Sequence, residues 1–189
     1  MVARIERRLG RYRLIAAPLA GKPVARAFLA GARQGSGVVA ETTGRTLEEA
    51  LALLAEMLIQ RDAAAREARR LEDSIPLRVP TAEEYRDALA CVAPSDGQWA
   101  MLRAHAAAGA KGLISRELAA AAGWTDFSAA NLQYGLLGRA VAEYLGITLP
   151  KREDQSETAA TFMLATGAWN GPDGTFLWVI HPELAAALD

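Results

Sequence analysis

The residues that decide the fold are 115–146, SRELAAAAGWTDFSAANLQYGLLGRAVAEYLG. A short helix is expected over 116–122, and Gly123-Trp124 interrupts it. A longer helix then begins near residue 126 or 128 and runs to 145, with Gly146 where left-handed C-terminal caps favour glycine. A short helix, a turn and a long helix in this order predict a helix-turn-helix arrangement.

The segments on either side extend this arrangement. Two helices are predicted upstream, because Thr81 with Glu84 and Ser95 with Gln98 have the spacing of capping boxes. Downstream, the strand-like runs Thr161–Ala165 and Thr175–Ile180 flank a turn at Asn170–Gly174 and predict an antiparallel hairpin. With a closing helical turn over 181–188, residues 81–189 are predicted to form a winged helix-turn-helix domain.

The chain before residue 73 predicts a separate small domain, residues 1–72. Strand-like runs at Arg11–Ala17, Lys22–Ala30 and Val38–Thr42 predict three strands, and a capping box at Thr46 opens a helix with an apolar stripe of leucines. Two prolines in 73–80 predict the linker. The fold class is therefore α+β, with a three-stranded sheet and helix followed by the winged-helix-like domain.

Composition and charge limit the class of protein. The 189 residues are 51% hydrophobic, enough to build cores, yet no apolar run approaches the roughly 18 residues of a membrane span. We expect a cytoplasmic protein without a membrane partner. Residues 1–72 hold 13 Lys and Arg against 8 Asp and Glu, whereas 73–189 hold 8 against 14. The basic half predicts phosphate contacts, or alternatively only a solvated surface, with these candidates: Arg11, Arg13, Lys22 and Arg26.

The helix over 127–145 carries the strongest functional pattern. At 100° per residue, one side gathers large side chains and is predicted to face the core: Leu132, Leu136, Leu137, Ala140 and Tyr144. The other side is a stripe of small residues, flanked by Tyr134 and Arg139: Ser128, Asn131, Gly135, Gly138 and Ala142. Interior glycines destabilise a helix, so the stripe predicts close approach by nucleic acid or by another helix, of this chain or of a dimer partner.

If nucleic acid approaches, each polar side chain has a suitable contact. Asn131 can bind adenine, Arg139 can bind guanine or phosphate, and Tyr134 can stack on a base. Ser128, Arg116 and Lys111 complete the candidate nucleic-acid contacts.

The same residues carry a family resemblance. The segment Ile114–Ala119, Gly123-Trp124 and Ser128–Arg139, within about 95–147, resembles a segment found upstream of the nuclease domain in bacterial HNH endonucleases. The resemblance implies a DNA-reading attachment, with modified DNA among its targets, and implies this role for Asn131, Tyr134 and Arg139. No nuclease domain follows in this sequence, so we do not expect cleavage.

The inventory of reactive residues predicts a protein that is not an enzyme. The only histidines are His105 and His181, and neither has a Cys or His at metal-ligand spacing, while Cys91 is the sole cysteine. No phosphate-binding loop, nucleophile elbow or dinucleotide fingerprint is present. We expect no cofactor and no metal.

Two functions remain. The first is a DNA-binding module of a bacterial or phage restriction, defence or regulatory system. The second is a protein-binding module, such as a phage or mobile-element inhibitor of a host defence complex. The basic N-terminal half favours DNA, and the acidic second half favours a protein complex as partner.

Overall fold

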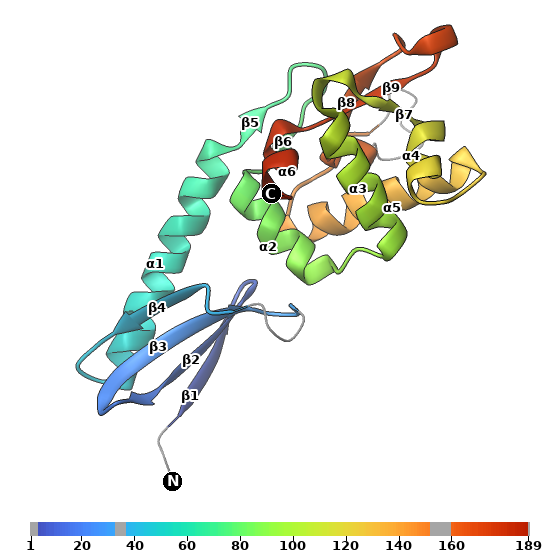
Figure 1. Cartoon of the computed structure of the whole chain (residues 1–189). Helices are drawn as coiled ribbons and strands as arrows, with labels where there is room; N and C mark the ends of the chain where they lie inside the picture. Colours follow the sequence, from blue (N-terminus) through green and yellow to red (C-terminus); the bar gives the residue numbers. More distant parts are fainter. Residues whose placement is uncertain (1–3, 33–36, 152–159, 189) are drawn as a thin grey trace. The chain divides into compact units, whose positions relative to one another are not determined.

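The computed structural model describes residues 4–32, 37–151 and 160–188, and it divides into two compact α+β units, Met1–Ala68 and Arg69–Asp189. Each unit is described by itself (Figure 1). The division falls between Ala68 and Arg69, four residues before the predicted domain end at 72.

The first unit is an antiparallel sheet with one helix. The strands pair in the order β1-β2-β3-β4, and the helix α1 follows them in the chain. Their bounds are β1 (Ile5–Leu9), β2 (Tyr12–Leu19), β3 (Lys22–Leu29), β4 (Ala40–Thr43) and α1 (Leu47–Ala68). The prediction of three strands is wrong, because Ile5–Leu9 adds a fourth. Within the described residues this segment pairs only with β2, and its three central residues are charged and exposed, so it lacks the alternation by which a strand is recognised.

One face of this sheet holds the core of the unit. Helix α1 buries the predicted leucine stripe, with Leu51, Leu54 and Leu58 each at most 1% exposed. The sheet contributes Tyr12, Leu14 and Ala16 of β2, each at most 2% exposed. Figure 1 shows α1 beside the sheet of this unit.

The second unit contains five of the six α-helices among the described residues. Its elements are β5 (Arg70–Leu71), β6 (Arg78–Val79), α2 (Ala82–Val92), α3 (Asp96–Ala108), η1 (Gly109–Lys111), β7 (Leu113–Ile114), α4 (Ser115–Ala121), α5 (Phe127–Leu145), η2 (Ala160–Met163), β8 (Ala165–Ala168), η3 (Pro172–Gly174), β9 (Leu177–Ile180) and α6 (Pro182–Ala187), where η marks a 3₁₀ helix. The two capping boxes predicted for this unit are present, at Thr81 with Glu84 and at Ser95 with Gln98. Among the described residues, none of the helices has both the length and the apolar character of a membrane-spanning segment.

The segment predicted as a linker, 73–80, belongs to the second unit. It closes the hairpin of β5 and β6, and it sends Leu77 and Val79 into the core at 1% and 0% exposure. Prolines disfavour helix but are compatible with a turn between short strands, so the same residues that predicted a linker fit a packed hairpin.

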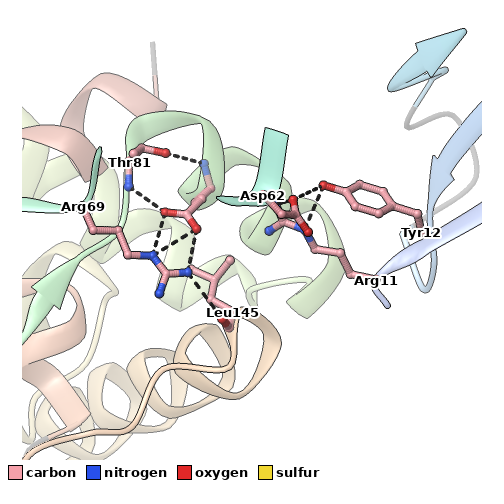
Figure 2. Close-up of polar contacts among 7 residues, drawn as sticks. Arg11, Tyr12, Asp62, Arg69, Thr81 and Leu145 are labelled. Atoms are coloured by element: carbon pink, nitrogen blue, oxygen red, sulfur yellow. Dashed lines mark hydrogen bonds and ion pairs between the residues drawn. The ribbon is translucent and has the colours of Figure 1, made fainter. Parts of the chain in front are cut away.

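A buried ion pair ties this hairpin to α2. Arg69 donates from Nη2 to Oε1 of Glu84 at 2.6 Å and from Nε to both carboxylate oxygens at 3.1 Å. The same carboxylate accepts from the Thr81 backbone N–H at 3.1 Å, as part of the capping box. Figure 2 shows Arg69, Thr81 and Leu145 around it.

The second unit also contains a three-stranded sheet, in the order β7-β9-β8, whose first strand precedes α4 and whose other two follow α5. The predicted hairpin exists, with Ala165 opposite Ile180 and Ala168 opposite Leu177. Its predicted first strand, Thr161–Ala165, is wrong except for its last residue. Residues 160–163 form η2 instead, and η2 packs on α5 with Ala160 and Met163 buried.

Candidate functional site

Helix α5 forms over 19 residues between two explicit caps. Asp126 accepts from the backbone N–H of Ser128 at 2.8 Å and from its hydroxyl at 2.6 Å. These two bonds hold the pKa of the Asp126 carboxyl below its usual range. At the other end Gly146 has φ +63°, the left-handed conformation that the sequence predicts there.

The prediction of which side of α5 faces the core is wrong. The buried side consists of Ala130, Tyr134, Leu137, Gly138, Val141, Ala142 and Leu145. Leu132 and Leu136, predicted to be buried, are 61% and 47% exposed. Of the predicted core residues, only Leu137 is buried, so the solvent-facing side carries two leucines four residues apart.

Tyr134 cannot stack on a base, because it is 1% exposed. Its hydroxyl lies 2.9 Å from Nδ1 of His105, and Nε2 of that ring lies 3.0 Å from the Trp178 carbonyl oxygen. A carbonyl only accepts, so Nε2–H donates to Trp178 and Nδ1 accepts from Tyr134. Burial raises the pKa of Tyr134 and lowers that of His105, which keeps both side chains neutral.

The C-terminal half of the small-residue stripe is covered by the chain itself. Gly138 and Ala142 are buried, and a Cβ built on Gly138 would lie 2.1 Å from the Ala160 carbonyl oxygen of η2. The glycine is therefore required by a 3₁₀ helix of the same unit. Close approach by nucleic acid is excluded at these two buried positions, and the predicted alternative, approach by another helix of this chain, is confirmed at Gly138.

The remaining candidates on α5 lie at the surface. Ser128, Asn131 and Arg139 are exposed. The Oδ1 atom of Asn131 accepts from the Ser115 hydroxyl at 2.7 Å, so α4 fixes the orientation of this amide. Gly135, between them, is half-buried, with only the Thr161 hydroxyl within 4 Å of a Cβ built there.

Two cations of the same unit are also exposed. Arg116 lies in the first turn of α4, and Lys111 ends η1, two residues before β7. The structure thus leaves five of the six candidates of the second unit accessible: Ser128, Asn131, Arg139, Arg116 and Lys111.

The candidates of the first unit differ from one another in their surroundings. Arg11 is only 13% exposed and donates to Asp62 at 2.8 Å, while the Tyr12 hydroxyl donates to the same carboxylate at 2.6 Å (Figure 2). Burial, opposed by the nearby guanidinium, raises the pKa of Tyr12 to about 12. Arg11 is consequently a structural residue, and its predicted role as a surface phosphate contact is wrong.

The other three are more accessible. Lys22 is exposed, and the Arg13 side chain is 52% exposed, above the ring of Phe28. Arg26 is half-buried and pairs with Glu41 at 2.5 Å. Of the four predicted basic contacts, Arg13 and Lys22 therefore best fit a phosphate.

A polar cluster around His181 was missed. The His181 side chain is 0% exposed, with Nε2 at 2.8 Å from the Phe162 carbonyl oxygen and Nδ1 near Arg70 and Glu72. Arg70 also pairs with Glu183 at 2.7 Å. Arg70 and Glu72 are far from His181 and Glu183 in sequence, and only the fold of this unit brings the four side chains together. Within the described ranges, no group of three or more His, Cys, Asp and Glu could hold a metal ion.

Comparison with known proteins gives no assignment. No protein-family model, no curated protein and no solved structure matches the chain.

Proposed function

We propose that this chain is a non-enzymatic DNA-binding module of a bacterial or phage restriction, defence or regulatory system. In this proposal the second unit is a winged-helix-like domain that reads bases with the exposed side of α5. Phosphates are contacted by Arg116 and Lys111 of this unit and by Arg13 and Lys22 of the first unit.

The observation that carries the proposal is the order of elements in the second unit. Helix α3, strand β7, helices α4 and α5, and then the β8–β9 hairpin follow one another, and the three strands pair in the order β7-β9-β8. This is the order expected for a winged helix, in which the second helix of the helix-turn-helix enters the major groove. Helix η2, before β8, is an addition to that arrangement.

The accessible side chains have the chemistry that this role requires. Asn131 presents an amide that can bind the N6 and N7 edge of adenine, and Arg139 presents a guanidinium for guanine or phosphate. The hydroxyl of Ser128 can bind either a base or a phosphate. Residues at the N-terminal end of a recognition helix are those that commonly reach base edges, and Ser128 and Asn131 lie there.

A second candidate is a protein-binding module. Leu132 and Leu136 are exposed on one side of α5, an arrangement typical of helices that dock on an apolar groove. The second unit also carries 10 Lys and Arg against 15 Asp and Glu over 69–189, a balance that disfavours phosphate binding.

Fluorescence anisotropy with duplex DNA at several salt concentrations tests the proposal. We expect Asn131→Ala and Arg139→Ala each to weaken binding to a preferred duplex by about 1–3 kcal/mol. Arg13→Ala and Lys22→Ala should instead weaken binding to all duplexes and lower the salt slope by about one unit per lost contact.

The control is Glu143→Ala, an exposed residue of the same helix, which should leave DNA affinity unchanged or slightly higher. If the chain has no DNA affinity at about 50 mM salt, where phosphate contacts are strongest, the DNA proposal fails and the protein-binding candidate replaces it.

A further inference from the structure

Strand β4 is the outer strand of the first unit's sheet. In the described part of the chain no strand pairs with its far side, and β3 lies on its near side. Gly44 donates its backbone N–H to the Pro23 carbonyl at 3.2 Å, and Thr42 lies opposite Ala25. Because bonded and non-bonded pairs alternate in an antiparallel ladder, Thr42 bonds to β3, and the backbone N–H and C=O groups of Glu41 and Thr43 point away from it.

The side chains of this strand divide cleanly between the two faces. Thr42 donates its hydroxyl to the Ala50 carbonyl of α1 at 2.8 Å, so it lies on the helix-covered face. Glu41 lies on the opposite face, where it pairs with Arg26. Thr43 shares the face of Glu41, since side chains alternate along a strand.

Exposed apolar side chains stand beside this edge. Leu53 and Met57 are one helical turn apart on α1 and are 46% and 44% exposed. With residues 41–43 they line an open depression of about 460 Å³. The edge therefore combines outward backbone donors and acceptors with an apolar strip on the helix above it, the two components of a strand-pairing interface.

We infer that β4 pairs antiparallel with β4 of a second copy of this chain. The register that satisfies both edges places Thr42 opposite Thr42 of the second copy, on the two-fold axis. Each Glu41 then lies opposite the Thr43 of the other copy, and each such pair exchanges two N–H···O bonds. Centring the axis on Glu41 would place two carboxylates directly opposite each other, which is unfavourable.

The same two-fold axis completes the apolar strip. Both α1 helices lie on one face of the joined sheet, so Leu53 and Met57 of each copy approach those of the other across the axis. An isologous contact of this kind uses one surface twice, which requires the self-complementarity that this register provides. The dimer is independent of any DNA contact made by the second unit.

Sedimentation equilibrium of the full chain, at concentrations up to about 200 µM, tests the contact, because short interfaces bind weakly. We expect a species of twice the 20.1 kDa chain mass. Met57→Glu would place two carboxylates near the axis and should raise the dimer dissociation constant at least about tenfold. Ile59→Glu is the matched control, since this residue is 58% exposed on the same helix but outside the strip, and it should leave the constant unchanged.

A cross-link tests the register directly. In the proposed pair the two Thr42 Cα atoms lie about 4.5 Å apart, which a disulfide can span. Thr42→Cys in a Cys91→Ser background should form a disulfide-linked dimer under mild oxidation, while Ile59→Cys in the same background should not. A chain that stays monomeric at the highest concentration, or a dimer that neither Met57→Glu weakens nor Thr42→Cys cross-links, would overturn the inference.

Discussion

Replacing Arg69 tests whether the hairpin before residue 81 is part of the second unit. The Arg69 and Glu84 side chains are 10% and 3% exposed and are joined by three hydrogen bonds of 3.1 Å or less. Arg69→Met keeps much of the apolar stem but leaves the carboxylate buried with only backbone partners. Breaking a buried pair in this way costs about 3–5 kcal/mol, a large share of the roughly 5–15 kcal/mol of a typical domain.

The assay is urea unfolding of the full chain followed by tryptophan fluorescence. All four tryptophans lie in the second unit, so the signal reports on that unit alone: Trp99, Trp124, Trp169 and Trp178. Arg78→Met is the matched control, because Arg78 is exposed in the same hairpin, and its change should stay within about 0.5 kcal/mol.

A second variant isolates the charge. Glu84→Gln keeps an oxygen for the Thr81 N–H but removes the buried negative charge, so adding it to Arg69→Met should recover part of the lost stability. The reasoning is refuted if Arg69→Met costs less than about 1 kcal/mol, or if the double variant is no more stable than Arg69→Met alone.

Three further predictions concern the core beneath α5. Gly138→Ala should destabilise the second unit by about 1–3 kcal/mol in urea unfolding, because its Cβ would meet Ala160. Gly135→Ala, whose Cβ would make only an ordinary contact with the Thr161 hydroxyl, should be neutral or stabilise by up to about 1 kcal/mol. Equal effects would contradict the packing. Tyr134→Phe should cost about 1–3 kcal/mol by the same assay, because Nδ1 of His105 loses its buried donor, and no loss would contradict this bond. Burial lowers the pKa of His105 below its unfolded value of about 6.5, so its contribution to stability is present above pH 6.5 and is lost as the pH falls below it. Urea midpoints measured between about pH 5 and 7.5 should therefore decrease toward low pH, and the decrease should be smaller in His105→Gln. The same pH dependence of the midpoint in this variant would exclude His105 as its source.

Features fixed by local chemistry could be predicted from the sequence. The capping boxes at Thr81 and Ser95 define the starts of α2 and α3, and Gly146 ends α5 as predicted. Each of these signals acts within a few residues, through a side chain and the backbone groups of one helical turn. The hairpin turn before β9 could also be predicted, because its turn-forming residues act over the same short range.

Features that depend on distant partners could not be predicted. Strand β1 has no apolar alternation, and its pairing with β2 is what makes it a strand. The segment 73–80 has the composition of a linker, yet Leu77 and Val79 are buried, and Arg69, just before the hairpin, pairs with Glu84 of α2. Composition indicates the local conformational preference of a segment, whereas its burial depends on which distant parts of the chain pack against it.

Helix α5 shows how the two kinds of information conflict at the candidate site. Its sequence allows two core faces, one rich in leucine and one rich in small residues, and hydrophobicity alone favours the leucine face. The buried side matches neither face in full, because it joins Gly138 and Ala142 to the large side chain of Tyr134. Tyr134 finds a buried acceptor in His105, and Gly138 lets the backbone of η2 approach. Burying this side exposes Leu132, and Ser128, Asn131 and Arg139 are among the polar groups that a partner can reach. Whether the partner is DNA or a protein therefore depends on whether the exposed leucines or these polar groups supply the binding energy. Comparing the loss of binding in Leu132→Ser with the loss in Asn131→Ala distinguishes these two possibilities.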